Sequence, residues 1–309
     1  MIIKRRLGFV GLGMMGHPMV CHLAAKGFAP TVYDVDGAAM ARLAGVEGVK
    51  VAASLAELAK ASDVVITMLP DGNVVRRVAL GDPLGSNDHL LAGLQVGSVI
   101  VDMSSSDPFG TRELGAVLAT HDIGLLDAPV SGGIKGARAA SLAIMVGGDA
   151  ADVASCRDIL LAMGKAVHHA GSLGAGHAAK ALNNYVSAAG LLAAVEAVIA
   201  GQRFGLDPAG LIDIINASTG RNNSTESKVH QQILSRDFAG GFALSLMAKD
   251  LRTALGLARQ SGLTLPLAEA CIEVWNKAET TLEAGVDHTA IARLLEGING
   301  EVLRSPSKG

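Results

Sequence analysis

A glycine-rich loop between an apolar run and a helix-like segment constrains the fold of this 309-residue chain more than any other feature. The loop reads Gly11-Leu12-Gly13-Met14-Met15-Gly16, after the apolar run Leu7–Val10. In this context the first glycine permits a tight turn, the second lets backbone approach a ligand, and the third lets the helix pack on the strand. Amides at the start of the helix then face a phosphate group. The loop therefore predicts a dinucleotide-binding unit at residues 11–16.

Short apolar runs alternate with helix-like segments throughout the first half of the chain. The predicted strands are Leu7–Val10, Thr31–Tyr33, Val64–Met68, Val99–Val101, Gly124–Ala128 and Ala143–Val146. The predicted helices are Met15–Lys26, Ala38–Ala44, Leu55–Ala59, Val74–Val78 and Thr111–Thr120. Such alternation is typical of parallel strands joined by crossover helices, and uniformly apolar strands suit a sheet covered on both faces. We expect an α/β, doubly wound Rossmann domain with a parallel sheet over residues 1–165.

The second half is helical in pattern, and residues 166–309 predict an all-α domain that begins with a long interdomain helix. The expected helices are Gly174–Phe204, one opened by Asp207 as N-cap and Pro208, Leu244–Ser261, Pro266–Ala284 and Thr289–Gly297. Ser305–Gly309 is expected to be a frayed tail. The apolar segment Tyr185–Ala200 suggests a buried subunit interface, so we expect a homo-oligomer, a dimer or tetramer.

Composition excludes several classes of protein. A net charge of −3 with one Trp, two Tyr and six Phe gives no basis for a nucleic-acid surface. Three widely spaced cysteines predict neither a disulfide framework nor a metal site, and they suit a reducing cytoplasm. Glycines interrupt the apolar run after Lys4-Arg5-Arg6, which argues against a signal peptide. The segment Tyr185–Gly201 is shorter than a membrane span and contains Glu196, so we expect no membrane partner.

The end of the second predicted strand bears on the cofactor. Asp34 lies 18 residues after Gly16, where an acidic side chain hydrogen-bonds an adenosine ribose. The alternative is a turn or helix-capping role. Asp34 and Asp36, with no adjacent arginine, would repel a 2′-phosphate, so the sequence favours NAD over NADP.

Three further segments follow predicted strands at the edge where such sheets bind ligands. They are Met68-Leu69-Pro70, Asp102–Ser106 and Asp127–Gly133. Ser131-Gly132-Gly133 offers a hydroxyl and successive amides that can wrap a carboxylate, although a flexible surface turn is the alternative. For the serine run Ser104–Ser106 the alternative is a capped turn before Pro108.

Polar residues line one face of the predicted helix that begins the second half. Lys180, Asn183, Asn184 and Ser187 stand at i, i+3, i+4 and i+7 among apolar neighbours. An ordinary solvated face is one interpretation. The other is catalytic, because burial lowers the pKa of a lysine from ~10.4 toward ~7–8. The neutral amine could then accept a hydroxyl proton while the neighbouring C–H hydride leaves for a nicotinamide.

Four motifs together resemble the β-hydroxyacid dehydrogenase family, which includes 3-hydroxyisobutyrate dehydrogenases and tartronate semialdehyde reductases. The resemblance covers essentially the whole chain. The motifs are Gly8–Gly16 with Pro18-Met19, Asp127–Gly133, Gly174-x-Gly176-x-x-x-Lys180-x-x-Asn183-Asn184, and Met247–Leu251.

The resemblance implies an NAD-dependent dehydrogenase or reductase for a small 3-hydroxy acid, or its semialdehyde, with a carboxylate-bearing substrate. Lys180 matches the family's catalytic lysine and Asn184 its substrate-orienting asparagine. The substrate-carboxylate loop matches Ser131, Gly132 and Gly133. Positions that contact the cofactor match Leu69, Pro70, Ser105 and, beside the nicotinamide, Lys249. An exposed lysine paired with Asp250 is the alternative for Lys249.

Two departures from the family pattern concern the substrate pocket. Ala140, followed by Ser141, stands where the family usually has glycine, and Met103 stands within the usual Asp-Ser-Ser-Thr. We expect substrate choice in the loop Thr219–Ser224, where Arg221 either pairs with a second anionic group or is solvated.

Other functions remain open beside the leading one. Tartronate semialdehyde reduction is the nearest, and threonate and sulfolactaldehyde are further substrate candidates. Imine reductases of similar architecture usually replace the lysine, and 6-phosphogluconate dehydrogenases have a longer helical domain. A non-catalytic dinucleotide-binding module would not need Lys180 beside Asn183 and Asn184.

Overall fold

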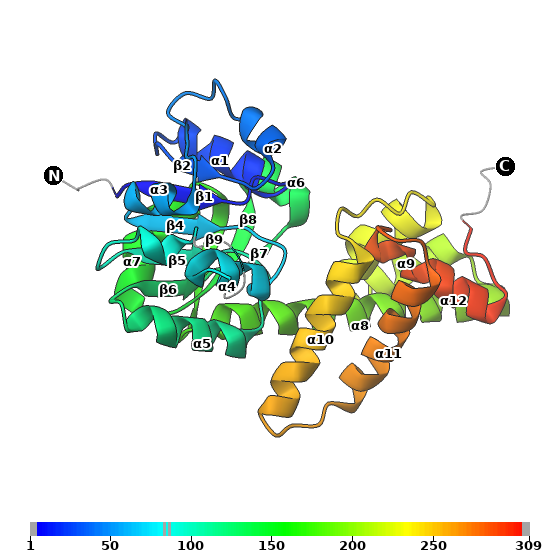
Figure 1. The fold of residues 1–309 in the computed structure, drawn as a ribbon. Coiled ribbons are helices and arrows are strands. Elements are labelled where there is room, and N and C mark those ends of the chain that lie inside the picture. Colours follow the sequence, from blue (N-terminus) through cyan, green and yellow to red (C-terminus); the bar gives the residue numbers. More distant parts are fainter. Residues whose placement is uncertain (1–4, 83–84, 86–87, 305–309) are drawn as a thin grey trace. The chain divides into compact units, whose positions relative to one another are not determined.

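The computed structural model describes residues 5–82, 85 and 88–304. Contacts divide the chain into two compact units, one ending at Lys180 and the other starting at Ala181 (Figure 1). The domain boundary near residue 165 stays a prediction. The expected frayed tail, Ser305–Gly309, lies outside the described residues.

A sheet with strand order β3-β2-β1-β4-β5-β6-β8-β7, and with β9 paired to β8, forms the centre of the first unit. The strands are β1 Leu7–Val10, β2 Thr31–Tyr33, β3 Lys50–Val51, β4 Val64–Thr67, β5 Val99–Asp102, β6 Gly124–Asp127, β7 Val130–Ser131, β8 Leu142–Gly147 and β9 Gly164–Gly171. Neighbours from β3 to β6 pair in parallel. The strand order reverses between β1 and β4, the point at which doubly wound sheets bind ligands. The predicted Rossmann-type fold is confirmed.

The far end of this sheet departs from the all-parallel prediction. Strand β8 runs antiparallel to both β6 and β7, so the expected parallel direction of Ala143–Val146 relative to its predecessor is wrong. The chain between β7 and β8 contains only the six-residue helix α6, Gly133–Arg138, rather than a full crossover helix. Strand β9 was not predicted, because Lys165, His168 and His169 interrupt any apolar pattern.

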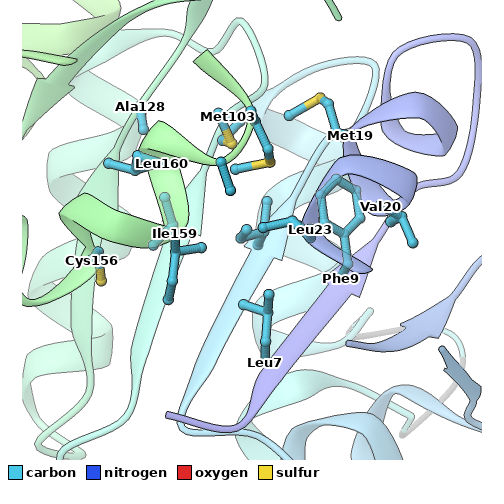
Figure 2. Close-up of a cluster of buried hydrophobic side chains, with 14 of the residues drawn as sticks. Leu7, Phe9, Met19, Val20, Leu23, Met103, Ala128, Cys156, Ile159 and Leu160 are labelled. Atoms are coloured by element: carbon cyan, nitrogen blue, oxygen red, sulfur yellow. The ribbon is translucent and has the colours of Figure 1, made fainter. Parts of the chain in front are cut away.

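Helices cover both faces of the sheet. They are α1 Gly16–Ala25, α2 Gly37–Ala41, α3 Leu55–Lys60, α4 Gly72–Leu80, α5 Pro108–Ala119, α6 and α7 Ala150–Leu161, with a 3-10 turn at Leu90–Ala92. Alternate strand residues belong to different cores: Val64 and Ile66 pack with residues of α1 and α7, and Val65 with residues of α3, α4 and α5. Figure 2 shows side chains of the first core, from Phe9 of β1 to Ile159 of α7.

The second unit is helical, as predicted, and helix α8, Ala175–Phe204, continues into it from the first. The other helices are α9 Pro208–Asn216, a π-helical segment Thr225–Leu234, α10 Leu244–Gln260, α11 Pro266–Thr281, a 3-10 turn His288–Ala290 and α12 Ile291–Asn299. Asp207 caps α9 by accepting the Gly210 amide at 2.8 Å, which confirms that prediction. The π-helical segment was not predicted. The core of this unit surrounds Trp275, which is fully buried.

Candidate active site

The three loop glycines at the end of β1 differ in what surrounds them. Gly11 has a left-handed backbone (φ +99°), and a Cβ there would lie 2.3 Å from the Met68 carbonyl oxygen. A Cβ on Gly16 would lie 1.8 Å from the Gly11 oxygen, so only glycine lets α1 start here. A Cβ on Gly13 would meet nothing within 4 Å. Among the described residues no side chain caps α1, whose N-cap is Met15. This turn therefore presents open backbone and uncapped amides, which suits a dinucleotide pyrophosphate.

Asp34, just after β2, is held against the same loop. Its Oδ2 accepts the Leu12 amide at 2.6 Å and its Oδ1 accepts the Asp36 amide at 2.9 Å. Each carboxylate oxygen retains acceptor capacity for a ribose hydroxyl. The capping role considered as an alternative belongs to Asp36, which accepts the Ala38 amide and caps α2.

An arginine that sequence adjacency did not reveal also lies at this loop. Arg42, at the end of α2, donates from Nη2 to the Leu12 carbonyl at 3.2 Å. No arginine adjoins Asp34 along the chain, but Arg42 and Asp34 both hydrogen-bond the backbone of Leu12. Its sequence separation from Leu12, 30 residues, explains why it was missed.

The loops after β4 and β5 are joined by a buried serine. The Leu69 amide donates to Ser104 Oγ at 2.9 Å, and the Ser104 amide donates to Asp102 Oδ1 at 3.0 Å. Because β4 and β5 are parallel neighbours, Leu69, Pro70 and Ser105 follow strands that end at the same edge of the sheet. The structure thus brings together the predicted cofactor-contacting positions of the first unit.

The predicted carboxylate loop follows β6 and contains two left-handed glycines. Ser131 ends β7, Gly132 (φ +126°) precedes α6, and Gly133 (φ +58°) begins it. In the part of the chain that the structure describes, no side chain caps α6. Ala140, which departs from the family glycine, has φ +48°, a left-handed conformation that favours glycine. The sequence departure therefore coincides with a real backbone constraint.

Lys180 and Asn184 are both buried on α8, with 8% and 6% exposed surface. The Asn184 amide donates from Nδ2 to Asp250 Oδ2 of α10 at 2.6 Å, and its Oδ1 accepts from Asn183 Nδ2 at 3.1 Å. These bonds fix the orientation of the Asn184 side chain. Asn183 itself is exposed, and Lys249, beside Asp250, is partly buried.

A buried polar network at the start of α8 was not predicted. Asp127 Oδ1 accepts the Gly174 amide at 2.8 Å, and its Oδ2 accepts the His177 amide at 2.7 Å. Burial raises the pKa of Asp127, while the neighbouring His177 and these amides act in the opposite direction. Asp127 is thus a cap for the helix that carries Lys180, supplied from the end of β6.

The His177 side chain links α8 to the cofactor loops. Its Nε2 donates to the Ser104 carbonyl at 3.1 Å, and its Nδ1 lies 2.8 Å from Thr111 Oγ1. Asp102, paired in register with Asp127, accepts from Thr67 and Ser106 hydroxyls at 2.9 Å each. Two aspartates ending neighbouring apolar strands were the available sequence signal for this network.

Two protein-family models match successive parts of the chain. Residues 6–171 match the model for the NAD-binding domain of 6-phosphogluconate dehydrogenase. Residues 174–295 match the model described as NAD-binding of NADP-dependent 3-hydroxyisobutyrate dehydrogenase.

Similar proteins match over nearly their full length. The chain is 35% identical to 2-(hydroxymethyl)glutarate dehydrogenase of Eubacterium barkeri, over 96% of both chains. It is 33% identical to an NAD-dependent L-serine dehydrogenase of Pseudomonas aeruginosa, over 96% of this chain and all of that one. The solved structure of Mycobacterium tuberculosis 3-hydroxyisobutyrate dehydrogenase with L-serine is similar with a TM-score of 0.86 and 35% identity, over 95% of this chain and 99% of that one.

Proposed function

Because this chain belongs to the β-hydroxyacid dehydrogenase family and is an NAD(P)-dependent oxidoreductase acting on CH–OH groups, we propose that it interconverts a small 3-hydroxy acid and its semialdehyde. The relatives named above act on, or are bound to, 3-hydroxyisobutyrate, L-serine and 2-(hydroxymethyl)glutarate by their names. All three compounds carry a hydroxymethyl group on the carbon next to a carboxylate. The proposed substrate class is therefore a 2-substituted 3-hydroxypropionate. Glycerate, the reduced partner of tartronate semialdehyde, belongs to the same class.

The buried position of Lys180 on α8, one turn before Asn184, carries this proposal. A lysine kept from water can hold either the neutral or the protonated amine, as a general acid–base group requires. In oxidation the Lys180 amine accepts the hydroxyl proton, and in reduction the ammonium returns it. Asn184, fixed by Asp250, orients the substrate.

Ser131, Gly132 and Gly133 are the proposed carboxylate loop. Two left-handed glycines in succession turn the backbone sharply here, and successive amides together with the Ser131 hydroxyl are the groups that would bind the carboxylate. Binding the carboxylate there would fix which carbon of the substrate presents its C–H bond.

The proposed dinucleotide contacts are the Gly11–Gly16 loop, Leu69, Pro70, Ser105 and Lys249. The nicotinamide of the bound dinucleotide would accept the hydride.

We propose NAD as the preferred form, because the Asp34 carboxylate at the loop would repel a 2′-phosphate. Asp34→Ala should then lower the ratio of kcat/KM for NAD over NADP. An unchanged ratio in Asp34→Ala would show that Asp34 does not select between the two dinucleotides. A lower kcat/KM for NADP in Arg42→Ala would show that Arg42 contributes to the use of NADP.

The direct test follows NADH absorbance with 3-hydroxyisobutyrate, L-serine, glycerate and 2-(hydroxymethyl)glutarate. Lys180→Ala should lower kcat by at least ~10²-fold on the best substrate while NADH binding, measured by its fluorescence, is kept. Lys277→Ala, on the exposed face of α11, is the control and should leave kcat unchanged. Near-normal turnover in Lys180→Ala would overturn the mechanism.

A further inference from the structure

Besides Lys180, which lies on α8 itself, a lysine of the second unit contacts this helix. Lys228 lies in the π-helical segment Thr225–Leu234, and its Nζ is 3.1 Å from Ser187 Oγ of α8. The start of this segment is also held to α8, since Ser224 Oγ donates to the Ser187 carbonyl at 3.4 Å. Irregular π-helical turns occur frequently at functional sites. The Lys228 ammonium is therefore fixed against one particular position of α8.

The charges around Lys228 leave its ammonium without a close anion among the described residues. The acidic group whose charge acts on this ammonium is Asp287, which raises the pKa of Lys228 against the effect of burial. The Asp287 carboxylate already accepts four hydrogen bonds, from the Gly241 and Phe242 amides on Oδ2 and from the Thr289 amide and hydroxyl on Oδ1. No salt bridge joins it to Lys228 in the described part of the chain.

Burial of this ammonium is costly without a counter-charge. Its desolvation lowers the pKa of Lys228 to about 8, against the opposing attraction of Asp287. The hydrogen bond to Ser187 uses one of the three N–H donors of the ammonium. An anion bound here would meet a partly desolvated positive charge with donors still available.

The position of Ser187 on α8 relates this charge to the proposed chemistry. Lys180, Asn184 and Ser187 stand at i, i+4 and i+7, so they share one face of a single helix. At ~1.5 Å per residue, Lys180 and Ser187 are about 10 Å apart along the axis. Lys228 therefore meets the far end of the polar row that starts with the proposed general base.

Arg221, for which the sequence left open either pairing with a second anionic group or exposure to solvent, is differently placed. Its guanidinium lies 3.6 Å from Glu226, and both side chains are exposed. An exposed ion pair of this kind contributes little stability, and the Glu226 carboxylate already neutralises the charge of Arg221. Arg221 therefore serves as a reference for Lys228, since both are cations of the same stretch of chain.

We propose that Lys228 and Ser187 bind a second carboxylate on the C2 substituent of the substrate. The preferred substrates are then 3-hydroxy acids that are dicarboxylates, rather than those with a neutral substituent. This inference rests on the proposed function, because it concerns the same site. It assigns substrate selectivity to Lys228 and leaves the oxidation step to Lys180.

The test compares two substrates of matched shape, 2-(hydroxymethyl)glutarate and 2-(hydroxymethyl)pentanoate, whose arms end in a carboxylate and a methyl group. The measured quantity is the ratio of their kcat/KM values. Wild-type protein should favour the dicarboxylate by on the order of 10- to 100-fold, and Lys228→Met should abolish that preference. Lys228→Arg should restore part of it, because the charge is kept. Arg221→Met is the control and should leave the ratio unchanged.

Each outcome of this experiment decides a separate question. Equal use of the two substrates by the wild-type protein, or a Lys228→Met variant that keeps the wild-type ratio, overturns the inference while the proposed function stands. Equal loss on both substrates in Lys228→Met, with a lowered melting temperature, identifies a structural lysine and also overturns it. Turnover of no 3-hydroxy acid by the wild-type protein overturns the proposed function and the inference with it.

Discussion

Ala140 combines a side chain with a backbone conformation that normally belongs to glycine. It follows α6 with φ +48°, whereas Ala139 next to it has φ −92°. The left-handed conformation costs an L-residue roughly 1–2 kcal/mol, which a glycine at this position would avoid. Part of this gain in stability is lost again, because glycine also gives the unfolded chain more conformational freedom. Ala140→Gly should therefore raise the free energy of unfolding by about 0.5–1 kcal/mol in urea titration.

Ala139→Gly is the matched control for this substitution. There the added flexibility relieves no strain, so the variant should be less stable than the wild type. A loss of stability in Ala140→Gly of the same size as in Ala139→Gly would contradict the argument.

At the residue scale, the sequence predicts positions whose constraint is local. The roles of Gly11, Gly13 and Gly16 follow from a strand–turn–helix context, and the structure gives each the expected surroundings. Lys228 and His177 were missed because their significance comes from partners 41 and up to 73 residues away. A single sequence holds no signal for such pairings.

At the scale of elements, the first turn of α8 depends on a carboxylate from outside the helix. Asp127 is the acceptor for the Gly174 and His177 amides, and Lys180 follows one turn later. Asp127→Ala leaves two buried amides unpaired and should cost about 1–3 kcal/mol of stability. Because the same turn positions Lys180, kcat should fall as well, with KM for the dinucleotide little changed.

Asp149→Ala provides the comparison for Asp127→Ala. Asp149 accepts the Ala151 and Asp152 amides and caps α7, a helix of the same unit without a proposed catalytic residue. It should lower the melting temperature without lowering kcat measured well below that temperature. Equal kcat in the two variants would show that the Asp127 cap is structural only.

A strand could be predicted from the sequence where its burial on both faces produces a continuous apolar run. Strands β1, β4 and β5 are buried at every residue, and their apolar runs identify them. Lys165, His168 and His169 interrupt the apolar residues of strand β9, which is largely exposed or half-buried, and β7 has only two residues. Neither strand therefore produces a recognisable apolar run. The direction of β8 is set by its pairing with β6 and β7, which an apolar run alone does not specify.

At the scale of the whole molecule, α8 presents an apolar stripe that the described chain leaves exposed. Leu182, Val186 and Phe204 are 40%, 68% and 86% exposed, and Ala193 and Ala197 between them are exposed too. At about 100° per residue these positions fall on the side of α8 opposite Lys180 and Asn184. By length and composition alone, this helix is long and apolar enough to span a membrane. Core helices of soluble proteins share this property.

We propose that this stripe packs against a second copy of the chain, in agreement with the homo-oligomer expected from the sequence. Sedimentation velocity at micromolar concentration should then give a dimer or tetramer for the wild-type protein. Val186→Glu places a charge within the stripe and should shift the protein to monomer, because an unpaired charge in an apolar interface is costly. Leu263→Glu, at another exposed apolar position outside α8, should keep the wild-type assembly. A monomeric wild-type protein, or an unchanged assembly in Val186→Glu, would exclude α8 as the subunit interface.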